Sequence, residues 1–190
     1  MKNPMQIGNV KTMQYLIPGW FRCQFVTNPY GLVHLGLEAS LEQQVFAFMA
    51  SETESSSFAL QDEVGGQVIQ QISQYLAGQR QELDVPSLGF LLFGMQKTVL
   101  DAVRNVPYGQ TITYAQLAAR INQPDAGKKV RDILRKNPLP LIFPCHRVVK
   151  DIDDIGSYVC SKYIKNRLLQ LEHINRNKTA NVLAVKQNLA

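Results

Sequence analysis

Short runs of alternating apolar and polar residues dominate the beginning of the chain. In residues 31–37, Val33, Leu35 and Leu37 alternate with more polar neighbours, as in a strand with one buried face. Similar patterns predict four strands, over residues 11–17, 21–27, 31–37 and 45–49. The second and third of these flank Asn28-Pro29-Tyr30-Gly31, which has the composition of a turn. The pattern therefore predicts a small antiparallel sheet.

A helical period replaces the alternation after a polar loop at residues 51–57. Asp62 can cap this helix, and Gly78 can end it. The apolar positions fall on one helical face at Val68, Ile69, Ile72, Tyr75 and Leu76. We therefore expect residues 1–88 to form a small α+β domain that ends in a linker over residues 79–88.

The pattern beyond residue 89 is mostly helical. A helix is expected over residues 90–104, with its apolar residues on a helical period at Phe93, Val99, Leu100 and Val103. Thr113 can cap a short second helix, and a third is expected over residues 126–136 after the polar turn Asn122-Gln123-Pro124-Asp125. Two short helices joined by a tight turn, the second one basic, have the layout of a helix-turn-helix.

The rest of the chain predicts less regular structure. The apolar residues 141–143 have strand character, and Pro144 would end that strand because it cannot donate to a ladder. Residues 156–161 are expected to be a loop before a final helix that carries Ile164 and Glu172. Strong structural signals are lacking from Asn175 onwards, so residues 177–190 are expected to be a tail.

Length and composition are those of a folded chain. At 190 residues and 45% hydrophobic content, one large domain or two small ones can bury a sizeable core. No apolar run reaches the ~18 residues of a membrane span, and the N-terminus lacks the pattern of a secretory signal. We therefore expect a cytoplasmic protein, nuclear if the source is eukaryotic, with no membrane partner. Three widely spaced cysteines argue against a disulfide framework and against zinc, and no metal or cofactor is expected.

The charge is distributed unevenly along the chain. Residues 1–88 hold 4 Lys and Arg against 8 Asp and Glu, whereas residues 89–190 hold 16 against 7. An acidic first half followed by a strongly basic second half indicates that the second half meets a polyanion.

The helix expected over residues 126–136 concentrates this positive charge. At about 100° per residue, its apolar side chains point one way from Val130, Ile133 and Leu134. The basic side chains point the opposite way from Lys128, Arg131 and Arg135, with Lys129 and Lys136 on the flanks. A solvated charged face is the alternative interpretation. The basic half-chain and the nearby Cys145 favour a surface that follows the phosphates of a polyanion.

Cys145 and His146 are the candidate reactive pair. Cys145 follows the apolar run and Pro144, and His146 and Arg147 come directly after it. A thiol there is a nucleophile if a base or a positive field converts it to thiolate. A buried structural Cys beside a structural His is the alternative for a lone dipeptide. Two prolines, the apolar run and the following Val148-Val149 make this stretch more specific.

These residues resemble a known family. Pro-Cys-His-Arg-Val, preceded by Asn137-Pro138 and an apolar run, is similar to the active-site motif of the methylated-DNA–protein-cysteine methyltransferases (O6-alkylguanine-DNA alkyltransferases). The segments 106–114, 156–158 and 165–172 resemble further parts of the family, and the good match runs from about residue 93 to 172. The resemblance implies a ribonuclease H-like α+β domain over residues 1–88 and a helix-turn-helix, winged-helix-like domain over residues 89–176.

The resemblance also implies a reaction and its residues. The alkyl group of guanine O6 or thymine O4 would pass irreversibly to Cys145, once per molecule, after the base leaves duplex DNA. His146 would take the thiol proton and Glu172 would orient the imidazole. At the other matching positions, Tyr114 would donate its hydroxyl to the guanine, Asn137 would support the loop, and Tyr158 would pack against the flipped base. The backbones of Cys145, Val148 and Val159 would hydrogen-bond the base edge, and Lys165 matches a family Lys near the site. A monomer suffices for this chemistry, and we expect one.

Three positions depart from the family pattern. Lys128 stands where an Arg usually fills the gap left by the flipped nucleotide, and Lys lacks the planar fork that stacks. Arg131 replaces a small residue one turn later. The run Val159-Cys160-Ser161 stands where a Gly-Gly pair usually follows one small residue. These departures concern base extrusion and pocket size rather than the nucleophile.

Two other functional classes remain as alternatives. A non-catalytic sensor of alkylated bases or other DNA-binding regulator could use the same scaffold, although relatives of that kind replace the Cys. A Cys-His hydrolase is the second alternative, but nothing in the sequence suggests an oxyanion hole, and the basic helix would have no purpose. The intact Cys145 favours the alkyltransferase.

Overall fold

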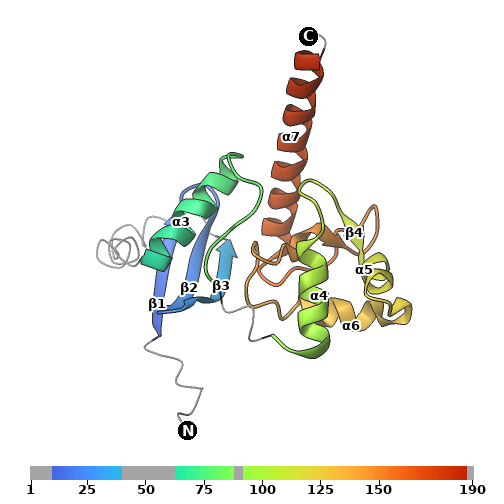
Figure 1. Ribbon diagram of the computed structural model, residues 1–190, viewed down its shortest axis with the longest axis horizontal. Coiled ribbons are helices and arrows are strands. Elements are labelled where there is room, and N and C mark those ends of the chain that lie inside the picture. The colour runs from blue at the N-terminus through green and yellow to red at the C-terminus, as the bar shows by residue number, and fades with distance from the viewer. Residues whose placement is uncertain (1–9, 40–62, 88–91, 188–190) are drawn as a thin grey trace.

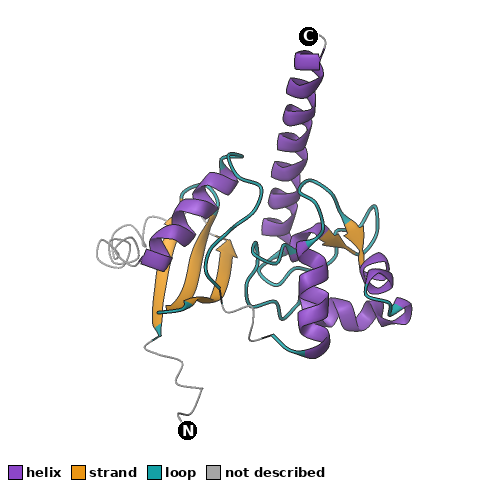
Figure 2. Ribbon diagram, in the orientation of Figure 1, coloured by secondary structure: helices purple, strands orange, loops and turns teal. Residues whose placement is uncertain are grey.

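The computed structural model describes residues 10–39, 63–87 and 92–187 of the chain. A sheet-and-helix part from the first half stands beside a mostly helical part from the second half, and one long helix projects beyond both (Figure 1). Strands dominate the first part, whereas the second contains one short strand pair (Figure 2). The predicted α+β class, with a small N-terminal antiparallel sheet and a helical C-terminal region, is confirmed.

The sheet consists of β1 (Lys11–Ile17), β2 (Phe21–Asn28) and β3 (Gly31–Ala39), antiparallel and in that order. The three strands confirm the prediction from alternation, and the fourth predicted strand at residues 45–49 lies outside the described residues. Asn28 Oδ1 closes the turn between β2 and β3, because it accepts the backbone N–H of Tyr30 at 2.9 Å and of Gly31 at 3.1 Å.

Helix α3 (Glu63–Leu76) covers one face of this sheet (Figure 1). The five apolar residues predicted on one helical face are all buried: Val68, Ile69, Ile72, Tyr75 and Leu76. The predicted loop at residues 51–57 and the predicted cap Asp62 lie outside the described residues. Beyond the helix, Gly78 adopts φ +74°, a left-handed conformation that turns the chain away from the helical path.

The helical part begins with α4 (Gly94–Arg104). Val99, Leu100 and Val103 are fully buried, as their spacing predicts. Phe93 is 72% exposed, so its assignment to the core face is wrong. The backbone at Phe93 is extended and the helix starts only at the next residue, which takes this side chain out of the helical period.

Helix α5 (Tyr114–Arg120) and helix α6 (Gly127–Leu134) pack against each other and confirm the helix-turn-helix layout. The predicted cap Thr113 is part of a full capping box. Its Oγ1 accepts the N–H of Gln116 at 3.1 Å, and Gln116 Oε1 accepts the N–H of Thr113 at 2.7 Å.

A short connection sets the angle between the two helices. Asn122 adopts φ +58° after α5, and a single 3₁₀ turn, η2 (Pro124–Ala126), leads into α6. Val130 and Leu134 of α6 are buried, and Ile133 packs partly buried against the same core. The predicted separation of an apolar face from a basic face is therefore present.

The strand predicted at residues 141–143 does not form. The chain folds back on itself so that Pro140 and Phe143 make an isolated bridge, and Leu141 adopts φ +72°. Local bonds replace a sheet ladder, because Leu139 donates its N–H to Asn137 Oδ1 at 3.0 Å and Phe143 donates to the carbonyl of Leu139 at 2.9 Å. The apolar run is thus buried inside a loop rather than in a sheet.

Three short elements follow this loop. Residues Cys145–Arg147 form a 3₁₀ turn, η3, and Val148–Val149 form strand β5. Strand β5 pairs in parallel with β4 (Ile112–Thr113), which directly precedes α5. The pairing ties the segment after Cys145 to the start of the helix-turn-helix.

Helix α7 (Lys162–Gln187) is the long helix that projects beyond both parts (Figure 1). The prediction of a tail at residues 177–190 is wrong for residues 177–187, which continue the helix, and residues 188–190 lie outside the described ranges. Ile164 and Leu168 anchor the first turns in the core, and each further residue then adds a hydrogen bond at low entropic cost. Of the helices described, none is long and apolar enough to cross a membrane.

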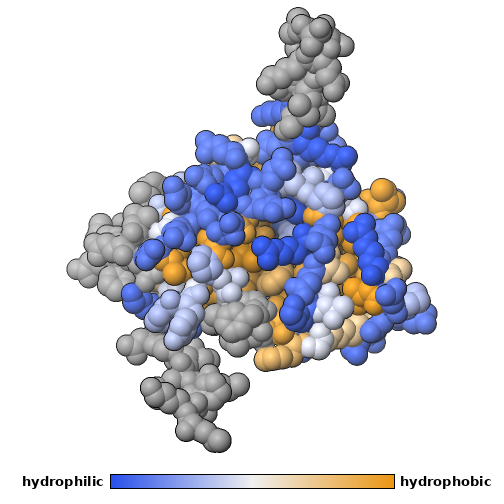
Figure 3. Space-filling model, viewed as in Figure 1, coloured by the Kyte–Doolittle hydropathy of each residue, from blue (hydrophilic) through white to orange (hydrophobic). Residues whose placement is uncertain are grey.

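Direct contacts join the two parts. Leu35 of β3 donates its N–H to the carbonyl of Pro138 at 2.9 Å, and the guanidinium of Arg167 on α7 lies 4.1 Å from the ring centroid of Trp20. Polar side chains cover much of the face in Figure 3, with apolar surface visible between α3 and α4. The predicted domain boundary at residues 88–89 lies outside the described residues.

Candidate active site

Asn137 organises the loop that carries Cys145. Its Nδ2 donates to the carbonyl of Phe143 at 2.9 Å and to Cys145 Sγ at 3.0 Å, while its Oδ1 holds the backbone of Leu139. The side chain is 2% exposed, so these bonds form away from competing water. Asn137 thus fixes the loop and polarises the sulfur with the same amide.

Burial dominates the acidity of Cys145. Removal from water raises the pKa of the thiol to about 11, although the hydrogen bond from Asn137 and the charge of Lys165 act in the opposite direction. At neutral pH the resting side chain is therefore a protonated thiol. Any reaction through thiolate needs a base close to the sulfur.

His146, the residue that follows Cys145 in the chain, is fully buried. Its Nε2 lies 2.7 Å from Glu172 Oε1, and its Nδ1 has no hydrogen-bond partner among the described residues. Burial lowers the pKa of His146, outweighing the bond and charge of Glu172. The imidazole is therefore neutral, and its proton belongs on Nε2 because a carboxylate can only accept. The lone pair of Nδ1 remains as a proton acceptor.

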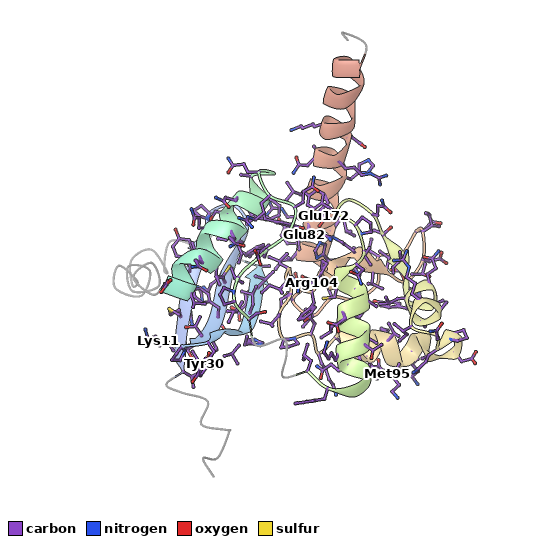
Figure 4. All side chains as sticks on the ribbon, viewed as in Figure 1. Lys11, Tyr30, Glu82, Met95, Arg104 and Glu172 are labelled. Atoms are coloured by element: carbon purple, nitrogen blue, oxygen red, sulfur yellow. The ribbon has the colours of Figure 1, made fainter. Side chains whose placement is uncertain are left out.

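Glu172 is buried in α7, where it meets both parts of the molecule, and Figure 4 shows its position between them. Besides His146, its carboxylate accepts the N–H of Gly109 at 2.8 Å and Nε of Arg147 at 3.1 Å. Burial works to raise the pKa of Glu172, but the bond and charge of His146, the charge of Arg147 and the hydroxyl of Tyr75 outweigh it and hold that pKa at about 2. The carboxylate is thus ionised at any physiological pH.

Two members of this cluster carry no role in the sequence analysis. Arg147 neutralises Glu172 and donates Nη1 to the carbonyl of Val106 at 2.8 Å. Tyr75, from α3, donates its hydroxyl to Glu172 Oε1. Arg147 could have been suspected from its place directly after the Cys-His pair. Tyr75 could not, because its helical spacing is that of a core residue.

Lys165 is buried on α7 and binds backbone rather than a carboxylate. Its Nζ donates to the carbonyl of Val148 at 2.6 Å and to that of Ser157 at 3.2 Å. Burial lowers the pKa of Lys165 to about 8, which the charges of Cys145 and Asp154 partly oppose. The ammonium thus links β5 to the loop before α7, and its positive charge lowers the pKa of the Cys145 thiol.

A pocket of about 530 Å³ opens beside this cluster. Among its lining residues are Tyr114, at the start of α5, and Tyr158, whose ring packs edge-on against His146 at 6.2 Å between centroids. Gly156 completes the wall with φ +71°, and a β-carbon there would lie 3.0 Å from the Tyr114 hydroxyl. Burial raises the pKa of Tyr114, so this hydroxyl keeps its proton and can donate.

The basic side chains of α6 divide between two hollows. Arg131 and Arg135 line the pocket with Tyr114, whereas Lys128 and Lys129 line a second hollow of about 550 Å³. Arg131 is also ion-paired with Asp132 at 3.0 Å. The basic residues that the helical wheel places together therefore line two different hollows, and Lys128 is not among the residues that line the pocket with Arg131.

The run Val159-Cys160-Ser161 follows Tyr158 of the pocket wall and directly precedes α7. Val159 and Cys160 are half-buried and pack against the core. Ser161 Oγ accepts the N–H of Ile164 at 3.1 Å, which caps the helix. Ser161 therefore has a structural function in this chain that a glycine would not supply.

Comparison with known proteins supports a common origin for this arrangement. Residues 94–174 match the family described as 6-O-methylguanine DNA methyltransferase, DNA binding domain. The inducible methylated-DNA–protein-cysteine methyltransferase of Bacillus subtilis is 30% identical over 142 residues, which cover 75% of this chain and 79% of the relative. The Methanothermobacter thermautotrophicus protein of that name is 34% identical over 57% of this chain, and the chain spans only 61% of its length.

Solved structures extend the likeness to the first half of the chain. The O6-methylguanine methyltransferase of Mycobacterium tuberculosis superposes with a TM-score of 0.68 and 25% identity, covering 88% of this chain and 94% of that one. The same protein in complex with DNA gives a TM-score of 0.66 and 27% identity, covering 86% and 93%. The sheet, α3 and the helical part therefore share one arrangement with a protein that was solved on DNA.

Proposed function

Because the chain belongs to the methylated-DNA–protein-cysteine methyltransferase family, we propose that it repairs DNA by moving alkyl groups from guanine O6, or thymine O4, onto Cys145. The observation that carries this proposal is the placement of a single thiol. Cys145 receives a hydrogen bond from Asn137 and adjoins the buried His146–Glu172 pair, whose imidazole packs against Tyr158 of the pocket wall. A nucleophile, a base and the group that orients the base are thus present in one cluster.

The thiol is activated by proton transfer to His146. Its Nδ1 lone pair accepts the proton of Cys145, directly or through one water molecule, and the imidazolium is held by Glu172. Because the pKa of Glu172 stays at about 2 in this environment, the proton remains on the imidazole rather than moving to the carboxylate. Lys165 and the Asn137 amide stabilise the thiolate that results.

The thiolate then displaces the base from its alkyl group. An S–C bond forms as the C–O6 bond breaks, and the electron pair of that bond passes to the guanine, which leaves as the anion. The protonated hydroxyl of Tyr114 donates to this anion as its charge grows. The product is a thioether and unmodified guanine after protonation, and no described side chain offers a route to reverse it, so each molecule reacts once.

The base has to leave the duplex before sulfur can reach it. The pocket beside Tyr114 and Tyr158 supplies a place for a flipped base, and Tyr158 supplies a ring to pack against it. The basic residues of α6 supply contacts to the phosphate backbone. Structures of the Mycobacterium tuberculosis relative include a complex with DNA, which is consistent with a double-stranded DNA substrate bound by α6.

The test is the intact mass of the protein after incubation with duplex DNA that contains one O6-methylguanine. A stable gain of one methylene, at most one per molecule and absent from Cys145→Ser, supports single-turnover transfer. An unchanged mass with specific binding of the lesion would identify a sensor instead. An unchanged mass together with hydrolytic turnover of an ester substrate would identify a hydrolase.

A further inference from the structure

Tyr75 reaches the reactive cluster from the other part of the molecule. It lies on the buried face of α3 and is 1% exposed, and its hydroxyl contacts both His146 and Glu172. The hydroxyl donates to Glu172 Oε1 and lies 3.3 Å from His146 Nε2. A phenylalanine would fill the same core position without a buried polar group to satisfy. The hydroxyl therefore has a purpose beyond packing.

We propose that Tyr75 is a positioning residue that keeps the His146 proton on Nε2 and tunes Glu172 as its partner. This proposal rests on the alkyl transfer proposed above. It assigns to the N-terminal part of the chain a direct contribution to the chemistry of Cys145, although Tyr75 itself does not touch the substrate.

The tautomer follows from the direction of the hydrogen bonds. The carboxylate of Glu172 can only accept, so the hydroxyl proton of Tyr75 points at Oε1. The lone pairs of the same hydroxyl oxygen then face Nε2 of His146. Two acceptors around Nε2 require a proton on that nitrogen, which leaves the lone pair on Nδ1 to receive the thiol proton.

The basicity of His146 follows from how Glu172 shares its charge. The carboxylate divides its negative charge among donors from Tyr75, Arg147, Gly109 and His146. Removing the Tyr75 donor concentrates that charge on the imidazole and stabilises the imidazolium. The titratable and charged groups that face this pair come from four segments: Tyr75 of α3, Tyr108 of the loop before β4, Cys145 and Arg147 of η3, and Lys165 of α7, with Tyr158 at the pocket wall.

The central test is the pH dependence of methyl transfer in Tyr75→Phe, which keeps the ring and removes only the hydroxyl. We expect the rate at neutral pH to fall, by less than the roughly 10²–10⁴-fold that a general base contributes in full. The acidic limb of the profile should move to higher pH, because a more basic His146 stays protonated longer as the pH rises. If the Tyr75 hydroxyl were purely structural, its removal would lower the melting temperature of the protein and leave the acidic limb of the pH profile unchanged.

Tyr108→Phe is the matched control. Its ring packs edge-on against Tyr75 at 5.7 Å between centroids. Its hydroxyl faces Glu172 through charge alone, because it accepts a hydrogen bond from Asn175 and bonds neither His146 nor Glu172. The variant removes a hydroxyl from the same aromatic pair, and we expect the pH profile of the parent protein.

A second substitution covers the case in which Tyr75→Phe does not fold. Fluorotyrosine at position 75 keeps the hydroxyl and makes it a stronger donor, so the acidic limb should move to lower pH. Alkylation of Cys145 by iodoacetamide, measured over the same pH range, reports on the His146–Cys145 proton transfer without DNA. Profiles that coincide with the parent for both position-75 variants would overturn the role of Tyr75. Absence of transfer by the parent protein, with shifted iodoacetamide profiles in the variants, would overturn only the alkyl-transfer proposal.

Discussion

The side-chain amide of Asn137 donates a hydrogen bond to the Cys145 sulfur, with Nδ2 and Sγ 3.0 Å apart. The same amide nitrogen also donates to the Phe143 carbonyl and so holds the loop before Cys145 in place. We predict that Asn137→Ala raises the pKa of the thiol further and slows its alkylation near neutral pH, by about tenfold for each unit by which that pKa rises. The loss of buried hydrogen bonds should also lower the free energy of unfolding by about 1–3 kcal/mol. Iodoacetamide rates against pH and urea unfolding measure the two effects.

Asn137→Asp separates the two functions of this side chain. Aspartate keeps an acceptor for Leu139 but cannot donate to sulfur, and its negative charge opposes the thiolate. We expect it to be less stable than the alanine variant, because the carboxylate would be a buried charge facing the Phe143 carbonyl, and to react no faster. An aspartate variant that reacts like the parent would show that the amide donor is not needed.

Cys145→Ser should abolish transfer and leave DNA binding intact. A serine hydroxyl has a pKa too far above neutrality for His146 to ionise it, whereas the basic residues of α6 lie outside the substitution. The measurement combines the mass assay with binding to duplex DNA by fluorescence anisotropy. Methyl transfer by this variant would place the nucleophile elsewhere.

Charge reversal on α6 should weaken DNA binding regardless of sequence and flatten its dependence on salt. Lys128→Glu with Lys129→Glu tests one hollow, and Arg131→Glu with Arg135→Glu tests the pocket side. Lys11→Glu on the sheet, which Figure 4 shows far from α6, is the control for a change of charge alone. Affinity equal to the control in both double variants would show that this helix is only solvated.

The buried carboxylate of Glu172 predicts acid sensitivity. Its pKa is about 2 in the folded protein against 4.5 for the free side chain, so the folded state binds fewer protons than the unfolded state between these values. Stability that is present above about pH 4.5 should therefore be lost as the pH falls towards 2, on the order of 3 kcal/mol. Urea unfolding at a series of pH values measures the loss.

Asp154→Asn is the comparison for this acid effect. The pKa of Asp154 is also lowered to about 2, by the backbone N–H of Gly156 first and then by Lys150, but this carboxylate is exposed to solvent. Solvent screens its interactions, so the variant should change the pH dependence of stability only slightly. If Glu172→Gln retained the full loss of stability at low pH, other carboxylates would be responsible.

Cys160→Gly should increase reaction with O6-benzylguanine relative to O6-methylguanine DNA. Cys160 places a side chain on the segment beside the site, and glycine removes it and frees the backbone. Ser161 is left in place because its hydroxyl caps α7, and its loss would cost about 1 kcal/mol of stability. Equal benzylguanine reactivity in the variant would show that Cys160 does not limit the opening.

Local rules were sufficient for the three strands of the sheet and for the start of α5. Alternation located the strands, and the cap at Thr113 located α5, because both signals act within a few residues. The same rules gave the wrong prediction for residues 141–143, which form part of a loop rather than a strand. The apolar residues of this loop are buried as in a strand, but the Asn137 side chain satisfies the backbone that a sheet would otherwise pair. Which partner serves a backbone group is a tertiary property that hydrophobic pattern does not encode.

The site shows the same division. Cys145 and His146 are adjacent in sequence and could be proposed from their chemistry, whereas Glu172 needed the family resemblance because a lone helical glutamate is ordinarily exposed. Tyr75 lies 97 residues from Glu172 in the chain and looks like an ordinary core aromatic. Only the packing of α3 against the helical part reveals that its hydroxyl is used.

Because Tyr75 of α3 bonds Glu172 of α7, the reactivity of Cys145 depends on the association of the two parts of the chain. Arg147 donates to the carbonyl of Gln81, and Tyr75 bonds Glu172, so groups from before residue 88 complete a site whose motif lies wholly after it. Two separately expressed fragments, one ending after Tyr75 and Gln81 and the other carrying Cys145, should therefore regain full reactivity only when they associate. Labelling of Cys145 would then report the joining of any two proteins fused to those fragments.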